Sequence, residues 1–262
     1  NMASLPIIQI TDLHLGATPD AVVAGIRPFD SFLAVLDALD QAGHGGDLLL
    51  LSGDLSGDSS AGAYIMLNEI LKERDKKAIW LPGNHDDVLL MEEYLVDFPL
   101  RSISEIGNWG ILALDSSQSG TPIGRISDDQ LQKVSEGLRQ LSGKSILVSM
   151  HHCPIALGCQ WLDQQRITNS QDLYDLLSPH SNVKAVVTGH VHQQFDGLWG
   201  NIPLYTSPSS SIQFKPQSEN FSISNQPPGY RRLTLENDGS VSTEVKFLSD
   251  FNQHPDTKNT GY

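Results

Sequence analysis

The sequence predicts an α/β fold. Four consecutive leucines, residues 48–51, lie between turn-type residues, a pattern typical of a strand that is buried on both faces. Further short apolar runs alternate along the chain with segments whose apolar residues recur at helical spacing. Because ligands of α/β proteins bind outside the carboxyl ends of strands, the residues that follow each predicted strand are the first candidates for a functional site.

In the first part of the chain, predicted strands and helices alternate. The glycines that follow residue 42 are typical helix terminators. The charged run at residues 72–77 is expected to be the solvated end of the second helix. The predicted strands cover residues 6–10, 48–51 and 78–81, and the predicted helices cover residues 29–42 and 61–73.

The alternation continues to about residue 190. Ser127 to Gln130 has the spacing of a capping box at the start of a helix, and Asn169 is expected to cap a shorter one. The predicted strands cover residues 109–114, 145–149 and 183–187, and the predicted helices run to about residues 141 and 177. The long connection over residues 155–168 is a candidate functional loop.

From residue 202 onward the pattern changes to short strands. Residues 204–206 and 211–214 are predicted strands, and residues 231–236 and 241–247 form a predicted hairpin with Asp238-Gly239 at its turn. Residues 217–229 are expected to form a surface loop. Because no linker interrupts the chain, we expect a single domain over residues 1–262, with residues 202–262 completing it.

Composition excludes several classes of partner. The chain has 31 acidic and 17 basic residues and a formal charge of −14, which argues against nucleic-acid polymers and anionic membranes. No apolar run approaches the roughly 18 residues of a membrane span, and no signal peptide is predicted, with Met2 as the expected natural start. Two cysteines are too few for a disulfide scaffold, which favours a cytoplasmic location.

Asp54 is the residue on which the functional prediction is built. It follows the leucine-rich strand, and Gly53 before it allows the backbone to approach a bound group closely. Its two carboxylate oxygens can contact two cations at once. The alternative is an aspartate in a strand-to-helix turn that caps the next helix.

Four other predicted strands also end in residues that bind metals. Asp12 and His14 stand at positions i and i+2, which share one face in an extended segment, and the same spacing relates His190 to His192. Such residues at the ends of five strands predict one shared site. The complete candidate set is Asp12, His14, Asp54, Asn84, His151, His190 and His192.

These donors suit two divalent metal ions. Mixed oxygen and nitrogen ligands without thiolate favour iron, manganese, zinc or cobalt over calcium or magnesium, and iron is our first expectation. Asp54 is expected to contact both ions. The other ligands divide into one set of Asp12, His14 and His192 and a second set of Asn84, His151 and His190.

Several neighbouring residues have alternative roles. Asn84 follows Pro82-Gly83 in an exposed turn, and its alternative is a left-handed position in a polar loop. Of the adjacent His151 and His152, only one is expected to reach the site. Cys153 is a candidate thiolate ligand, and its alternative is a semi-buried cysteine without a chemical role.

Two cations suggest phosphate chemistry. Ions about 3.5–4 Å apart lower the pKa of a bridging water and clamp a phosphoryl group for in-line attack. His85 has no place among the expected ligands, so it is free to protonate the leaving oxygen as a general acid.

The motifs resemble the calcineurin-like metallophosphoesterase superfamily in order and spacing. They are Asp12-x-His14, Gly53-Asp54, Gly83-Asn84-His85-Asp86, His151 and Gly189-His190-x-His192. The resemblance covers the first two hundred residues. It implies a four-layer α/β/β/α sandwich with two mixed β-sheets and the metal roles described above.

A second set of segments is similar to the bacterial class III cyclic nucleotide phosphodiesterases, in particular the 3′,5′-cyclic AMP phosphodiesterases of proteobacteria. The segments are residues 151–154, 158–163, 213–216, 220–221, 228–231, 255–257 and 261–262. This resemblance implies hydrolysis of the small molecule cyclic AMP to 5′-AMP by a metal-bridging hydroxide. It also implies that His14, Asp54, Asn84, His85 and His192 contact the nucleotide.

Alternatives within and outside the enzyme class remain open. A related enzyme would cleave another small phosphodiester, such as a 2′,3′-cyclic nucleotide or a glycerophosphodiester. Protein phosphatases of this superfamily usually carry Arg-Gly-Asn where this chain has Pro82-Gly83-Asn84. A non-catalytic scaffold would typically have lost ligands, and this chain keeps them all. Candidate purine contacts are Trp161, Phe214 and His152, with packing as the alternative role for each.

Overall fold

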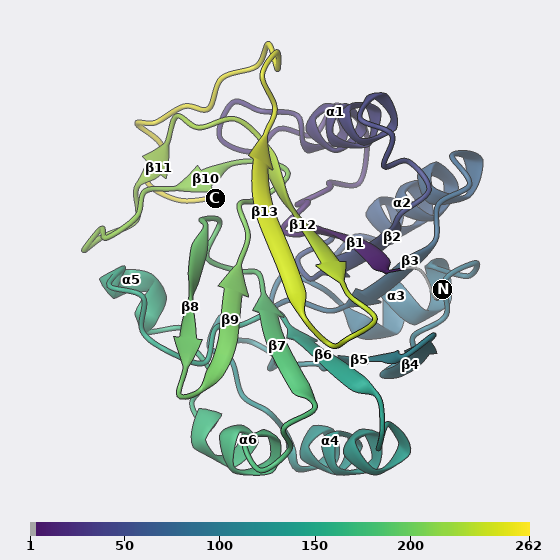
Figure 1. Cartoon of the computed structure of the whole chain (residues 1–262). Coiled ribbons are helices and arrows are strands. Elements are labelled where there is room, and N and C mark those ends of the chain that lie inside the picture. The colour runs from purple at the N-terminus through teal and green to yellow at the C-terminus, as the bar shows by residue number, and fades with distance from the viewer. Residues whose placement is uncertain (1–3) are drawn as a thin grey trace.

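The computed structural model describes residues 4–262, so Met2, the expected natural start, lies outside the described residues. Two β-sheets stand face to face, and helices cover the outer face of each (Figure 1). This is the four-layer α/β/β/α arrangement that the family resemblance implies. Within residues 4–262, no helix combines the length and the apolar character that a bilayer crossing requires.

The first sheet has the strand order β13-β12-β1-β2-β3. Its members are β1 (Leu5–Ile10), β2 (Leu48–Ser52), β3 (Ala78–Leu81), β12 (Gly229–Leu235) and β13 (Val241–Phe247). The pairs β1–β2 and β2–β3 are parallel, and β12 pairs antiparallel with both β1 and β13. The C-terminal hairpin therefore extends the sheet that the N-terminus begins.

The second sheet has the order β4-β5-β6-β7-β9-β8. Its members are β4 (Ile103–Ile106), β5 (Trp109–Ala113), β6 (Ser145–Met150), β7 (Val183–Thr188), β8 (Phe195–Trp199) and β9 (Ile202–Thr206). A separate short ribbon consists of β10 (Gln213–Phe214) and β11 (Ile223–Ser224). The β5, β6, β7 and β9 strands are parallel, so their carboxyl ends meet at one edge.

Three apolar layers hold the sheets and helices together. The leucines of β2 alternate between them: Leu49 and Leu51 pack against the helices outside the first sheet, and Leu50 packs between the two sheets. This confirms the prediction of a strand buried on both faces. The helices on the first sheet are α1 (Pro28–Gln41), α2 (Ala61–Glu73) and α3 (Val88–Tyr94). Those on the second sheet are α4 (Asp128–Gln140), α5 (Gln160–Asp163) and α6 (Ser170–Leu177).

Several local predictions need correction. The structure adds α3, α5, β4, β8 and β11, which the sequence interpretation left as connections. Lys76 is not solvated, because its ammonium donates to Asp40 at 2.8 Å and to the Gly45 carbonyl at 2.9 Å. Asn169 precedes α6, but its side chain bonds both backbone groups of Ile126 instead of capping the helix.

The predicted capping box at α4 is only half formed. The Ser127 hydroxyl accepts from the Gln130 backbone N–H at 3.2 Å, as the motif requires. The Gln130 side chain does not return to Ser127 and accepts instead from the Asp115 backbone N–H at 2.9 Å. The same glutamine therefore ties the helix to the end of β5.

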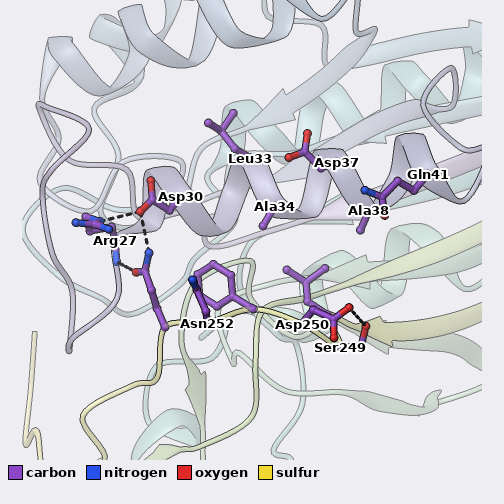
Figure 2. A pocket seen from close by; sticks show the side chains of 13 residues that line it. Arg27, Asp30, Leu33, Ala34, Asp37, Ala38, Gln41, Ser249, Asp250 and Asn252 are labelled. Carbon is purple, nitrogen blue, oxygen red and sulfur yellow. Dashed lines mark hydrogen bonds and ion pairs between the residues drawn. The ribbon is translucent and has the colours of Figure 1, made fainter.

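After β13, the chain returns across α1 and is fastened to it (Figure 2). Gln253 accepts from the Arg27 backbone N–H at 2.8 Å and donates to the Asp30 carboxylate at 2.7 Å. Further along, the Asp256 N–H donates to the Ala24 carbonyl at 2.7 Å. Beyond these contacts the chain ends beside β10 (Figure 1).

Candidate metal site

All eight predicted site residues follow the carboxyl ends of parallel strands and converge where the two sheets meet. The first sheet supplies the residues after β1, β2 and β3, and the second supplies those after β6 and β7. By strand, they are Asp12 and His14, then Asp54, then Asn84 and His85, then His151, and finally His190 and His192.

Asp12, His14 and His192 form the first group. Their ligand atoms all lie within 4.8 Å of one another, and the three side chains are buried. Asp12 Oδ1 is 3.1 Å from His192 Nε2, and the Nε2 atoms of His14 and His192 are 3.3 Å apart. Three ligand atoms therefore point at a common centre.

Asp54, His151 and His190 form the second group, again with ligand atoms within 4.8 Å of one another. Asp54 Oδ2 lies 3.2 Å from His151 Nε2 and 3.8 Å from His14 Nε2, so this carboxylate faces both groups. Asn84 and His190 line one cavity, and neither Asn84 Oδ1 nor His190 Nε2 has a hydrogen-bond partner among the described residues, although both atoms are buried. Buried polar atoms without partners are costly, and a bound cation would satisfy them.

The backbone brings these residues together in a way that sequence spacing did not predict. Five of the seven predicted ligands have positive φ: Asp12, His14, Asp54, His190 and His192, at 55°, 51°, 50°, 73° and 46°. The pairs at i and i+2 therefore do not lie in extended segments, and that part of the interpretation is wrong. Left-handed non-glycine residues are strained and cluster at functional sites.

Glycines make room for the converging side chains. A Cβ at Gly83 would overlap the Asp54 carboxylate. Gly53 has φ +98°, and a Cβ there would overlap the His151 ring. Gly53 thus accommodates a neighbouring side chain, whereas the sequence interpretation had it accommodating a group bound to Asp54. Asp54 also does not cap the next helix, since Ser60 is the N-cap of α2.

Backbone carbonyls orient two of the imidazoles. His151 Nδ1 lies 2.7 Å from the Ser52 carbonyl oxygen, and His192 Nδ1 lies 2.7 Å from that of Ile212. A carbonyl only accepts, so each Nδ1 carries a proton and each Nε2 faces the site. Second contacts of this kind are typical of histidines that bind metals.

The electrostatic field of the site favours charged carboxylates. Burial raises the pKa of Asp54, but His151, His85 and His14 together outweigh burial and hold that pKa well below its usual range. Burial lowers the pKa of His14 to about 3 and, together with His152 and His151, holds the pKa of His190 well below its usual range. The site therefore offers anionic carboxylates and, at His14 and His190, neutral imidazoles, the protonation states that bind cations.

His151 differs from the other histidines. Burial lowers its pKa, but Asp54 and Asp12 outweigh burial and raise it to about 10. The proton that His151 holds between two carboxylates must leave before its Nε2 can bind a cation. The two carboxylates therefore stabilise positive charge at this position, whether a proton or a cation carries it.

The loop after β3 is held by a residue that the sequence interpretation did not single out. Asp86 accepts from the Gly83 N–H at 2.8 Å, the Ser56 N–H at 3.0 Å and the Tyr64 hydroxyl at 2.7 Å. Pro82 and Gly83 are buried, so the expected exposed turn is wrong, and Asn84 is not in a left-handed conformation. Asp86 stands inside the Gly-Asn-His-Asp motif, which was the available signal for its role.

His85 lies at the edge of both groups. Its backbone N–H donates to Asp54 Oδ1 at 2.8 Å, and its ring is half-buried, with its centroid 5.1 Å from that of His14. Its ring nitrogen also lies within 4.8 Å of the ligand atoms of Asp54 and His14. The structure thus brings His85 next to two of the predicted ligands.

The neighbouring side chains with open roles have structural contacts. His152 is buried, and its ring nitrogens meet the Ser116 hydroxyl at 2.7 Å and the Pro122 carbonyl at 2.9 Å. Cys153 is 2% exposed, and burial raises the pKa of its thiol to about 12, which disfavours a thiolate ligand. Phe214 stacks on His192 with ring centroids 3.9 Å apart. His152 and Phe214 therefore pack around the site.

Comparison with known proteins agrees with this geometry. The family model for calcineurin-like phosphoesterases matches residues 5–194. The chain belongs to the calcineurin-like phosphoesterase family. Relatives that are 33–37% identical match nearly the full length of the chain. A 3′,5′-cyclic adenosine monophosphate phosphodiesterase, CpdA, of Escherichia coli K12 is 37% identical over 99% of this chain and 96% of its own length.

Two further relatives in this phosphoesterase family are similar over most of their lengths. The CpdA of Haemophilus influenzae is 36% identical over 98% of this chain and 95% of its own length. A 3′,5′-cyclic-nucleotide phosphodiesterase of Nostoc is 35% identical over 92% of each chain. Among solved structures, a dimetal phosphatase from Danio rerio superposes with a TM-score of 0.64, at 15% identity, over 95% of this chain and 100% of its own. That likeness supports the fold of the phosphoesterase family.

Proposed function

We propose that this phosphoesterase hydrolyses 3′,5′-cyclic AMP to 5′-AMP at a site that holds two divalent cations. The observation that carries the proposal is the convergence of seven metal-type side chains from five strand ends. Full-length similarity to curated cyclic AMP phosphodiesterases supports the choice of substrate.

The residues present fit a pair of cations. Asn84 Oδ1 and His190 Nε2 are buried ligand atoms without partners among residues 4–262. The carbonyl contacts of His151 and His192 Nδ1 turn the Nε2 atoms of both rings toward the site. We propose that Asp12, His14 and His192 hold one ion, that Asn84, His151 and His190 hold the other, and that Asp54 contacts both.

The donor set also limits the metal. Carboxylate, amide and imidazole donors without thiolate favour iron, manganese, cobalt or zinc, and iron is our first proposal. When bound, two such ions supply positive charge that lowers the pKa of water and holds phosphate oxygens in place.

The protein's own groups supply the remaining parts of the reaction. The half-buried His85 stands beside His14 and Asp54, where it can hold a proton for the departing 3′ oxygen. The Asp54 carboxylate fixes the His85 backbone, and Asp86 fixes the loop that carries it. We propose that His85 is the general acid and that His14, Asp54, Asn84, His85 and His192 contact the nucleotide.

The organisation of the chain is consistent with one functional unit. The C-terminal β12 and β13 pair beside β1, and His192 bonds the Ile212 carbonyl. We therefore propose that residues 1–262 act as a single domain, which the segment from about residue 202 completes. A cytoplasmic location remains a prediction from the two cysteines.

Hydrolysis of cyclic AMP by metal-loaded protein tests the proposal. Protein loaded with iron or manganese is incubated with cyclic AMP, and 5′-AMP is followed by chromatography. The same preparation is given 2′,3′-cyclic AMP and glycerophosphoethanolamine to test the alternative small phosphodiesters. We expect 5′-AMP formation to exceed both alternatives, and absence of turnover on every diester would favour a scaffold.

A further inference from the structure

Four aromatic side chains form a wall beside the candidate site: Trp161, Phe214, Phe221 and Tyr262. Trp161 contacts Phe214 and Phe221 with ring centroids 4.9 and 5.2 Å apart. Tyr262 continues the wall, with its centroid 5.8 Å from Phe214 and 5.9 Å from Phe221. The same wall and the predicted site residues Asn84, His85 and His190 line one cavity of about 180 Å³.

Tyr262 is placed there by the last segment of the sequence. Residues 253–256 are fastened to α1 and to the Ala24 carbonyl, and the Gly261 N–H donates to the Asn259 side chain at 2.9 Å. The ring of Tyr262 reaches the site from this segment, with its centroid 5.1 Å from His14 and 5.6 Å from His85, stacked on the latter. A residue that follows the metal-type motifs by about seventy positions therefore faces the proposed reaction centre.

The position of Tyr262 suits a contact that adjusts to a ligand. As a whole residue Tyr262 is 47% exposed, whereas Phe214 is 2% exposed. Tyr262 borders the cavity with His85 and also a second cavity of about 300 Å³ that His14 lines. No other atom of the described residues lies within 4 Å of the place of a Cβ on Gly261, so the backbone before Tyr262 has open space beside it.

Trp161 adds a polar group to the wall. Its indole Nε1 is buried and has no hydrogen-bond partner among residues 4–262. An indole N–H only donates, and buried donors normally have an acceptor. An acceptor on a ligand in the cavity would satisfy it.

We propose that this aromatic wall is a subsite for the heterocyclic base of the substrate, with Tyr262 stacking on the base and Trp161 Nε1 donating to an acceptor on its edge. The inference rests on the proposed function, because it places the phosphate beside Asn84 and His85 and the nucleoside against the wall. A flat base offers a π-face to Tyr262 and ring-nitrogen acceptors to Trp161. A glycerophosphodiester has no base to fill this subsite.

Product binding tests the subsite separately from turnover. Binding of 5′-AMP and of ribose 5-phosphate, which lacks the base, is measured by calorimetry on metal-loaded protein. Tyr262→Ala is expected to weaken 5′-AMP binding about 5- to 150-fold, the range for loss of one stacking contact, and to leave ribose 5-phosphate unchanged. Tyr262→Phe keeps the ring and should bind 5′-AMP as the wild type does. Lys258→Ala, in the exposed part of the same segment, serves as the control.

Trp161→Phe removes the indole N–H and keeps an aromatic ring. We expect it to weaken 5′-AMP binding about 2- to 12-fold, as for a typical neutral hydrogen bond. In turnover of cyclic AMP, Tyr262→Ala should raise KM more than it lowers kcat.

Three results would overturn the subsite. They are unchanged 5′-AMP binding in Tyr262→Ala, an equal loss of 5′-AMP and ribose 5-phosphate binding, and faster turnover in that variant, which would show that Tyr262 blocks the site. Failure of the wild type to hydrolyse cyclic AMP would contradict the proposed function, and the comparison of 5′-AMP with ribose 5-phosphate would still report on the base.

Discussion

His85 differs from its histidine neighbours because it is half-buried and its backbone, not its ring, is fixed by Asp54. We propose that a ring in this position exchanges a proton with the leaving group. The buried His190 and His14 rings, with lowered pKa values, are suited to binding cations instead.

Replacement of His85 by alanine is expected to lower kcat on cyclic AMP about 10²- to 10⁴-fold, the usual contribution of a general acid. Bis(p-nitrophenyl) phosphate releases p-nitrophenolate, which leaves without a proton, so its hydrolysis should fall far less. Initial rates on both substrates give the ratio. Elemental analysis should find the same metal content as in the wild type, and a lost ion would show that His85 is a ligand.

Cys153 gives a prediction that depends on pH. Burial raises the pKa of its thiol to about 12, so at pH 8 only about one molecule in ten thousand carries a thiolate. Native protein should therefore resist iodoacetamide at Cys153, and the thiol should react at an ordinary rate in denaturant. Mass spectrometry of the peptide measures both rates. Rapid labelling of native protein at pH 8 would restore Cys153 as a candidate ligand.

At the residue scale, the sequence predicted which side chains form the site but not their conformations. Carboxylate, amide and imidazole groups after strand ends are visible in the sequence. The positive φ values of Asp12 and His190 are not visible in the sequence, because contacts with segments that are distant in the sequence impose them. The Asp12 side chain, for example, accepts from the His190 N–H at 2.9 Å. Tyr262 stands in a segment that carries the family resemblance, but its place at the site was not predicted, because only the return of the chain across α1 brings it there.

At the scale of single elements, α4 depends on its cap. The Ser127 hydroxyl accepts from the Gln130 N–H, and α4 packs on the outer face of the second sheet. Ser127→Ala is expected to lower the free energy of unfolding by about 1 kcal/mol without changing activity. Urea denaturation measures the loss. Ser135→Ala inside the same helix is the matched control, and it should leave stability unchanged or slightly raised.

Strongly patterned elements were the ones predicted well. The structure has α2 and β3 at the predicted bounds, and β2 carries the predicted leucines. The missed α3 and β4 have only seven and four residues. Such short segments contain too few apolar residues to show a helical or strand period. The side chain of Asn169 bonds Ile126, 43 positions away, a choice that local capping rules do not contain.

At the scale of the whole molecule, Arg231 joins the two sheets. It is buried in β12 of the first sheet and donates to Asp196 of β8 at 2.6 Å and to the Thr206 carbonyl of β9 at 2.8 Å. Gln9 makes a second crossing, from β1 to the Thr188 carbonyl of β7 at 2.9 Å. Because the site draws its residues from both sheets, such contacts hold its two halves in register.

Asp196→Asn removes the anion that partners the buried Arg231 guanidinium. We expect a loss of about 1–3 kcal/mol in the free energy of unfolding, because a buried charge keeps only neutral partners. Glu244→Gln is the control. The side chains of Glu244 and Lys246 are half-exposed, and their charged atoms lie 3.7 Å apart. Loss of this ion pair should change the free energy of unfolding by less than about 1 kcal/mol. Thermal denaturation compares the two variants, and equal effects would contradict the role of Arg231.

Anomalous X-ray scattering from crystals grown with manganese most directly tests the claim that seven side chains surround two cations. We predict two anomalous peaks about 3.5–4 Å apart, with the Asp54 carboxylate in contact with both. Asp12, His14 and His192 should surround one peak, and Asn84, His151 and His190 the other. A single peak, or peaks away from Asp54, would contradict the account.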